Sequence, residues 1–173
     1  SHDIVRKLRD RQITSFTMDG IPRISRAQRM DALTSMSTVT GYRAVLDAAE
    51  RLPRFLPMIS TAIGNIKPAN VLVVGTGVVG LQAVATAKRL GAVVKAWDIR
   101  EAARTEAGSL GAKIAGFEVP KELAIAEGGY AKLLPEDWVK KEQAAIQEVV
   151  AESDIVVLSA LVPGSLAPAP RGR

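Results

Sequence analysis

The amino-acid sequence predicts an α/β fold built on a doubly wound parallel sheet, and three observations support this. The apolar, largely β-branched run at 71–74 leads directly into a glycine-rich turn and a helix-like segment. Further apolar runs follow at 93–97 and 155–158, and segments with helical periodicity separate them. Near-continuous apolar strands that alternate with helices are typical of parallel sheets covered on both faces.

The segment before the first buried strand is predicted to be mainly helical. Apolar residues recur near helical spacing between Met30 and Ala49, and Gly41 is a weak point in that run. In chain order, we predict the end of a helix at 3–11, a short strand at 13–18, a turn at 19–22, a helix at 26–52 and a shorter helix at 55–63.

The later elements follow in the order that a doubly wound sheet requires. Gly91 and Gly111 each end a helical pattern, as glycine commonly does. We predict strands at 71–74, 93–97, 113–119 and 155–158, helices at 78–90, 101–110 and 136–152, and an irregular stretch at 120–135. Four strands are fewer than the six of a complete sheet of this type. The sequence therefore predicts a helical segment over 1–66 and a truncated Rossmann-like lobe over 67–173.

The turn after the first buried strand has the spacing Gly-x-Gly-x-x-Gly, which is typical of dinucleotide-binding proteins. Gly75 permits a sharp turn, Gly77 lets the backbone approach a pyrophosphate, and Gly80 permits close packing of helix on strand. The N-terminus of the helix would direct unpaired N–H groups at the phosphates. The predicted phosphate-binding residues are Gly75, Thr76, Gly77, Val78, Val79 and Gly80.

An acidic residue, Asp98, follows the second apolar run, eighteen residues after Gly80. A carboxylate there would accept hydrogen bonds from the adenosine ribose and repel a 2′-phosphate, so NAD(H) is predicted over NADP(H). We assign Asp98, Ile99 and Arg100 to this ribose-binding segment, and Arg100 lies close enough to complicate the preference. The alternative is a glycine-rich turn in some other α/β protein, with Asp98 as a solvated loop acid.

Composition excludes several classes of function. The chain has no cysteine and a single histidine, His2, so no metal site is predicted and disulfides are excluded. The net charge is +5, but basic and acidic residues are mostly interleaved and aromatic residues are scarce, which argues against nucleic-acid binding. The uncharged stretch at 69–87 contains three glycines and several polar residues, so it is not predicted to span a membrane.

Further motifs are RISRAQRMD at 23–31, GYRA at 41–44, IKPA at 66–69, GGYAK at 128–132 and ALVPG at 160–164. With the glycine-rich turn, they resemble the NAD(H)-binding domain of proton-translocating NAD(P) transhydrogenase, in the alanine dehydrogenase/transhydrogenase family. The resemblance extends over about 8–168. It implies that the chain covers the second of two Rossmann-like lobes and the segment that leads into it.

The resemblance also implies a function and partners. Members of this family transfer hydride between NADH and NADP⁺ and couple the transfer to proton translocation. NAD(H) would be the cofactor of this chain, which would form a homodimer. A separate NADP(H)-binding domain and a proton-conducting membrane domain would be its partners. The chain would be a peripheral part of an inner-membrane enzyme, on the bacterial cytoplasmic or mitochondrial matrix side, and alone it would be nearly inactive.

Several residues take their expected roles from the resemblance. Arg23, Gln28 and Asp31 match the loop around the nicotinamide and its ribose, and Thr34 stands where the family usually has serine. Hydride transfer needs no acid or base, only oriented nicotinamide rings and exclusion of water, so these polar groups would act by orientation. The alternatives are a surface ion pair between Arg23 and Asp31 and a solvated Gln28. Met36 departs from the family pattern, in which glutamine is common.

A second group matches the adenosine side of the family's site. Tyr130 matches a tyrosine on a mobile loop that closes over the nucleotide, whereas Gly129 and Leu161 match positions that line the adenosine and ribose. The alternative for Tyr130 is a surface tyrosine. Two other functions stay open: alanine dehydrogenase, which shares the turn, Asp98 and the LVPG motif, and a non-catalytic NAD-binding or interaction module.

Overall fold

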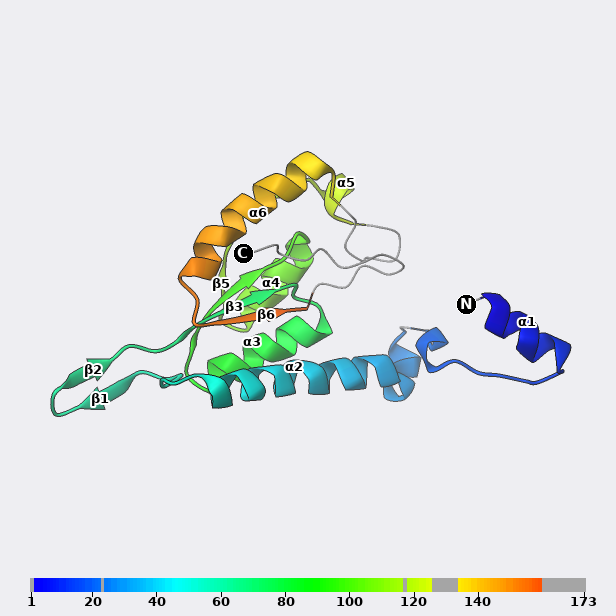
Figure 1. Ribbon diagram of the computed structural model, residues 1–173, viewed down its shortest axis with the longest axis horizontal. Coiled ribbons are helices and arrows are strands. Elements are labelled where there is room, and N and C mark those ends of the chain that lie inside the picture. Colours follow the sequence, from blue (N-terminus) through cyan, green and yellow to red (C-terminus); the bar gives the residue numbers. More distant parts are fainter. Residues whose placement is uncertain (1, 23, 117, 126–133, 160–173) are drawn as a thin grey trace. The chain divides into compact units, whose positions relative to one another are not determined.

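The structure is a computed structural model that describes residues 2–22, 24–116, 118–125 and 134–159 (Figure 1). The chain divides into two compact units, one over residues 1–37 and the other over residues 38–173. Within the described part of the chain, no helix combines the length and the hydropathy that a membrane span requires.

The first unit contains short helical elements. Helix α1 covers His2–Asp10, as predicted, and two 3₁₀ helices cover Met18–Gly20 and Ser25–Met30. The predicted strand at 13–18 is wrong. Phe16 is 94% exposed, and no described segment pairs with this stretch, so alternation of polar and apolar residues is not enough to make a strand.

Helix α2, Ala32–Arg51, starts six residues later than predicted because Asp31 caps it. The backbone N–H of Thr34 donates to Asp31 Oδ1 at 2.9 Å, and the Thr34 hydroxyl donates to Asp31 Oδ2 at 2.6 Å. A side-chain acceptor at this position satisfies an N–H group that the first turn of a helix leaves unpaired. The predicted single helix over 26–52 is therefore two elements that meet at Asp31.

Gly41 is a close-packing point of α2, and the helix continues through it without a break. A Cβ atom on Gly41 would lie 2.1 Å from the carbonyl oxygen of Val79 and 3.1 Å from Cβ of Gln82. Glycine at this position therefore allows the backbone of α2 to approach the first turn of α3, Val78–Arg89.

The predicted helix at 55–63 is also wrong, because this region starts an antiparallel hairpin. Strand β1, Ile59–Thr61, pairs with β2, Gly64–Ile66, and Ile59 lies opposite Ile66. Gly64 has φ +131°, which few other residues adopt, and its carbonyl accepts the Thr61 hydroxyl at 2.8 Å. The turn chemistry thus overrides a weak helical pattern.

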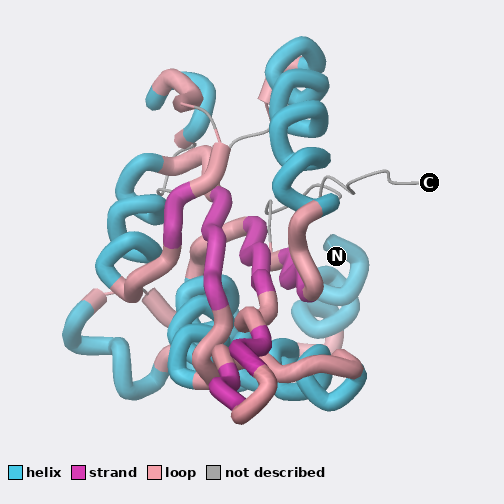
Figure 2. Tube along the Cα trace, turned by 90° about the vertical axis from the view of Figure 1, so that its left-hand side faces the viewer, coloured by secondary structure: helices cyan, strands magenta, loops and turns pink. Residues whose placement is uncertain are grey.

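The second unit contains the predicted four-stranded parallel sheet (Figure 2). Its strands are β3 (Asn70–Val74), β4 (Val93–Trp97), β5 (Lys113–Ile114) and β6 (Ile155–Leu158), in the spatial order β5-β4-β3-β6. Strand β5 is shorter than the predicted 113–119. The connecting helices are α3, α4 (Glu101–Ser109), the single turn α5 (Lys121–Ala124) within the stretch expected to be irregular, and α6 (Glu136–Ala151).

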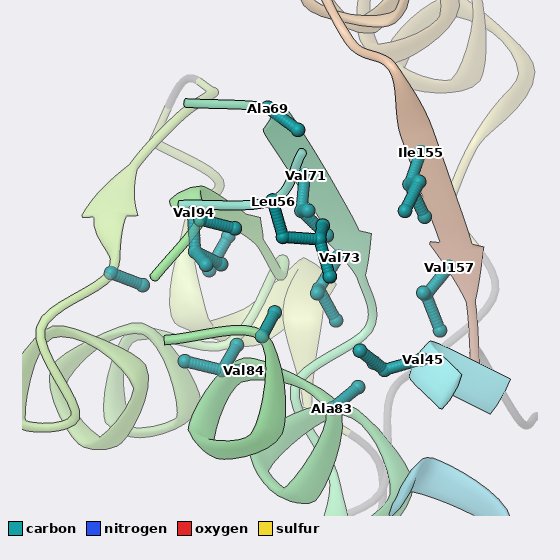
Figure 3. Packing of buried hydrophobic residues seen from close by; sticks show 14 of the residues in the cluster. Val45, Leu56, Ala69, Val71, Val73, Ala83, Val84, Val94, Ile155 and Val157 are labelled. Atoms are coloured by element: carbon teal, nitrogen blue, oxygen red, sulfur yellow. The ribbon is translucent and has the colours of Figure 1, made fainter. Parts of the chain in front are cut away.

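Both faces of the sheet are covered, as the apolar strands predicted. On one face, Val71 and Val73 of β3 pack against α2 and α3, where Val45 and Val84 are fully buried (Figure 3). On the other face, Leu72 packs with Trp97 of β4 and with Ile146 of α6, in a smaller cluster. Trp97 is 3% exposed and is the largest side chain of this cluster.

Substitution of Gly80 by alanine is expected to lower the free energy of unfolding by about 1–3 kcal/mol, the usual cost of overpacking. A Cβ atom there would lie 1.9 Å from the carbonyl oxygen of Gly75. Gly77→Ala is the matched control, since Gly77 has φ −77° and its Cβ would meet no atom within 4 Å. Urea denaturation of both variants measures the difference, and equal stabilities would contradict the close approach.

Candidate functional site

The glycine-rich turn connects the carboxyl end of β3 to the N-terminus of α3 and is held from both sides. The N–H of Gly75 donates to the carbonyl of Trp97 at the end of β4, at 2.7 Å. The carbonyl of Gly75 accepts the Ser159 hydroxyl, just after β6, at 2.6 Å. Strands β4 and β6 flank β3 on opposite sides, so the turn lies at the topological switch point of the sheet. This is the usual ligand site of open α/β sheets.

The predicted roles of three glycines can be compared with this geometry. Gly75 has φ +85°, so the sharp turn needs a residue without Cβ. Gly80 lies against the Gly75 carbonyl with no space for a side chain. Gly77 precedes α3, no described atom lies within 4 Å of the place its Cβ would take, and no described side chain caps that helix. The first N–H groups of an uncapped helix are available to an anion.

Asp98 is a buried acid that holds the turn, and it is 7% exposed, so it is not a solvated loop residue. Its Oδ2 accepts the backbone N–H of Thr76 at 2.8 Å and the Thr76 hydroxyl at 3.3 Å. Burial by itself would raise the pKa of Asp98, but the hydrogen bonds from Arg100 and Thr76 outweigh it and lower that pKa. The carboxylate is therefore ionised at neutral pH.

Arg100 occupies both oxygens of the same carboxylate. Its Nε lies 3.0 Å from Asp98 Oδ1, its Nη2 lies 2.8 Å from Oδ2, and its backbone N–H also donates to Oδ1 at 2.8 Å. Arg104, one helical turn later, donates to the carbonyls of Asp98 and Ile99 at 3.1 and 3.2 Å. A ribose diol that binds Asp98 would have to replace these guanidinium contacts. Arg100 therefore competes with a ribose for the carboxylate, which is the complication expected from its position.

The other predicted residues fall into two groups. Val78 and Val79 start α3, and Thr76 is 1% exposed. In the first unit, Gln28 is exposed in a 3₁₀ helix, while Asp31 and Thr34 form the cap of α2. This capping role of Asp31 was not predicted, although an aspartate directly before a run with helical periodicity is a helix-start signal. Arg23, Gly129, Tyr130 and Leu161 lie outside the described residues.

Two further groups near the turn were not predicted from the sequence. Ser159 contacts Gly75 across 84 residues of chain, and no local pattern reveals such a pair. Glu142 of α6 accepts the indole N–H of Trp97 at 3.1 Å, and Trp97 directly precedes Asp98 in the sequence. Burial raises the pKa of Glu142, the bond from Trp97 opposes that rise, and the charge of Asp98 adds to it. Among the described residues, no three His, Cys, Asp or Glu side chains could together hold a metal ion.

Comparison with known proteins agrees with this geometry. Residues 44–170 match the family described as alanine dehydrogenase/PNT, C-terminal domain. The chain is 48% identical over 166 residues to the first part of the NAD(P) transhydrogenase alpha subunit of Rhodospirillum rubrum, covering 95% of this chain and 43% of that protein. It is 40% identical over 169 residues to NAD(P) transhydrogenase subunit alpha of Haemophilus influenzae, covering 98% and 32%. The chain thus spans less than half the length of these relatives.

Among solved structures, a transhydrogenase matches this chain better than an alanine dehydrogenase does. The crystal structure of transhydrogenase from Sinorhizobium meliloti matches with a TM-score of 0.77 and 42% identity, over 97% of this chain and 44% of that one. An L-alanine dehydrogenase matches with a TM-score of 0.66 and 25% identity, over 98% and 42%. In sequence and in backbone, the chain is more similar to the transhydrogenases than to this alanine dehydrogenase.

Replacement of Glu142 by glutamine is expected to raise stability at pH 7, by less than about 1 kcal/mol because solvent screens this half-buried group. Glutamine can still accept the Trp97 N–H without the cost of a buried charge. The folded-state pKa of Glu142 is raised above 4.5. The contribution of this carboxyl to stability therefore falls as the pH rises from about 4.5 through the folded-state pKa.

The stability gain of Glu142→Gln should therefore shrink as the pH falls from the folded-state pKa toward about 4.5, and it should vanish below that pH, where the carboxyl is protonated in both states. Thermal unfolding followed between pH 4 and pH 8 measures this. Glu148→Gln, at an exposed position of the same helix, controls for the change in net charge. A pH-independent gain would contradict the assignment.

Proposed function

Because the chain belongs to the alanine dehydrogenase/PNT family, we propose that it is the NAD(H)-binding part of a proton-translocating NAD(P) transhydrogenase. The observation that carries the proposal is the glycine-rich turn held against a buried, ionised Asp98 at the carboxyl edge of a parallel sheet. The identity of 48% to a transhydrogenase alpha subunit, against 25% to an alanine dehydrogenase, favours this member of the family.

The residues of the turn fit a dinucleotide. The open space at Gly77 would admit a diphosphate, which would accept the first N–H groups of α3. Asp98 would accept hydrogen bonds from the adenosine ribose, with Ile99 and Arg100 beside it. The ionised carboxylate disfavours a 2′-phosphate and so favours NAD(H). When bound, the nicotinamide ring of the coenzyme supplies the hydride.

On the nicotinamide side, we assign Arg23, Gln28, Asp31 and Thr34 to orientation of the ring and its ribose. Asp31 already holds the first turn of α2 with both oxygens, so its contribution includes fixing the junction between α2 and the 3₁₀ helix that carries Gln28. Gly129, Tyr130 and Leu161 complete the proposal through the family resemblance. In hydride transfer, such groups act by holding the ring in a productive orientation.

The partners follow from the same proposal. A separate NADP(H)-binding domain would supply the hydride acceptor, and a membrane domain would carry the protons, with this chain on the cytoplasmic or matrix side. The relatives are named as an alpha subunit, or as the first part of one, and such names belong to enzymes made of several polypeptides. The fully exposed Ile63 in the β1–β2 connection offers an apolar contact for the proposed homodimer. Alone, the chain would show little turnover.

An alanine dehydrogenase is the second candidate, favoured by the TM-score of 0.66 to an enzyme of that name. Consumption of NADH on addition of pyruvate and ammonia would support it. For the transhydrogenase proposal, the test is hydride exchange from NADH to an NADP⁺ analogue when a separate NADP-binding domain is added. Absence of any change in NADH fluorescence at millimolar NADH would instead favour a degenerate, non-catalytic interaction module.

Substitution of Asp98 by alanine is expected to weaken NADH binding by about tenfold and to improve NADPH binding, since a charge-assisted ribose contact is lost. The substitution also removes the partner of Arg100, which becomes available to the 2′-phosphate. Fluorescence titration with both coenzymes measures the change. The double variant Asp98→Ala/Arg100→Ala should lose the gain for NADPH, and an unchanged coenzyme preference in Asp98→Ala would refute the ribose role.

Gln28→Asn should leave NADH affinity within about twofold of the original and slow hydride transfer by about tenfold or more. The shorter side chain keeps the amide but places it elsewhere, so orientation changes more than affinity. Single-turnover transfer with the added NADP-binding domain, alongside NADH titration, separates the two quantities. Equal losses in affinity and in transfer rate would argue against an orienting role.

A further inference from the structure

Ser159 is the residue that directly follows β6, and its side chain reaches the glycine-rich turn. Its backbone N–H continues the ladder to β3 by donating to the Val74 carbonyl at 2.9 Å. Its hydroxyl then donates to the next carbonyl along β3, that of Gly75, at 2.6 Å. The same hydroxyl oxygen lies 3.0 Å from the position that a Cβ of Gly80 would take, so it is packed into the angle between turn and helix.

One peptide unit of the turn is held at both of its ends. The carbonyl of Gly75 and the N–H of Thr76 belong to the same planar group. Ser159 donates to that carbonyl, and Asp98 accepts from that N–H at 2.8 Å. The two side chains come from the strands on either side of β3, so they fix the plane of this peptide relative to the sheet.

The glycine at position 75 makes such fixing necessary. With φ +85° and no Cβ, Gly75 offers little steric resistance to rotation of the peptide that follows it. If that peptide rotates, the N–H groups that follow at Gly77 and Val78 change direction as well. The hydrogen bonds of this peptide to Ser159 and Asp98 oppose the rotation, and the one from Ser159 is the shorter.

We infer that Ser159 is a positioning residue for the diphosphate of the bound coenzyme. It touches no atom of the coenzyme and acts by locking the peptide between Gly75 and Thr76, so that the N–H groups at the start of α3 point at the phosphates. This inference rests on the proposed NAD(H) site. It predicts a loss confined to ligands that carry a diphosphate, which a general weakening of the fold would not produce.

The test compares ligands with and without a diphosphate on the 173-residue chain. Ser159→Ala should raise the Kd for NADH and for ADP-ribose about fivefold, the effect of one hydrogen bond. The Kd for adenosine, followed by ligand-observed NMR, should change by less than about twofold, because adenosine has no diphosphate to accept the N–H groups at the start of α3. Ser159→Thr keeps the hydroxyl and should restore the NADH Kd.

Ser153→Ala is the matched control. That serine precedes the same strand, and its hydroxyl donates to the Val149 carbonyl at 2.7 Å, away from the turn. Its removal should leave the NADH Kd unchanged. An unchanged Kd in Ser159→Ala, an equal loss for adenosine and NADH, or failure of threonine to rescue would each overturn the inference.

A second measurement needs no coenzyme and separates this inference from the proposed function. Amide hydrogen exchange at Thr76 should be about fivefold faster in Ser159→Ala, because the peptide loses one of its two side-chain hydrogen bonds. If the original chain fails to bind NADH, the proposed function fails, while faster exchange at Thr76 still supports the locking contact. Unchanged exchange would overturn that contact whatever the chain binds.

Discussion

The close approach of α3 to the end of β3 is the constraint on which the rest of the second unit depends. The backbone at Gly80 lies so near the Gly75 carbonyl that no side chain fits between them. This contact sets the direction of α3, and α2 in turn lies against α3 at Gly41, where a Cβ would also clash. Two positions without side chains therefore fix how the helices on that face pack on the sheet.

The groups that stabilise the turn are also those that face the proposed ligand. Asp98 is buried, ionised and bonded to Thr76 and Arg100, so it stabilises the free protein before any ribose arrives. Because its pKa is lowered from 3.8, this stabilisation is present above that pH and is lost as pH falls through the folded-state pKa. Glu142, whose pKa is raised, has the opposite dependence. As the pH falls, the contribution of Asp98 to stability is therefore lost, whereas that of Glu142 is regained.

Local patterns predicted the parts of the fold that local physics decides. The buried strands at 71–74, 93–97 and 155–158 and the glycines that end α3 and α4 were predicted correctly, because apolar runs and positive φ values are local properties. The stretches 13–18 and 55–63 were predicted wrongly, since the first lacks a described partner strand and the turn at Gly64 decides the second. The contact of Ser159 with Gly75 spans 84 residues of chain and depends on tertiary placement, which no pattern of spacing reveals. Arg100 lies two residues from Asp98, so its proximity was predicted, but its contacts with both carboxylate oxygens were not.

The bond between the Trp97 indole and Glu142 connects β4, the strand that Asp98 directly follows, to α6. The indole is shielded from water and lies beside a carboxyl, and both conditions govern the wavelength and yield of its emission. Trp97 thus serves as an intrinsic optical reporter, one peptide bond away from the acid proposed to hold the sugar. Any rearrangement there that disturbs the indole would be visible without a label.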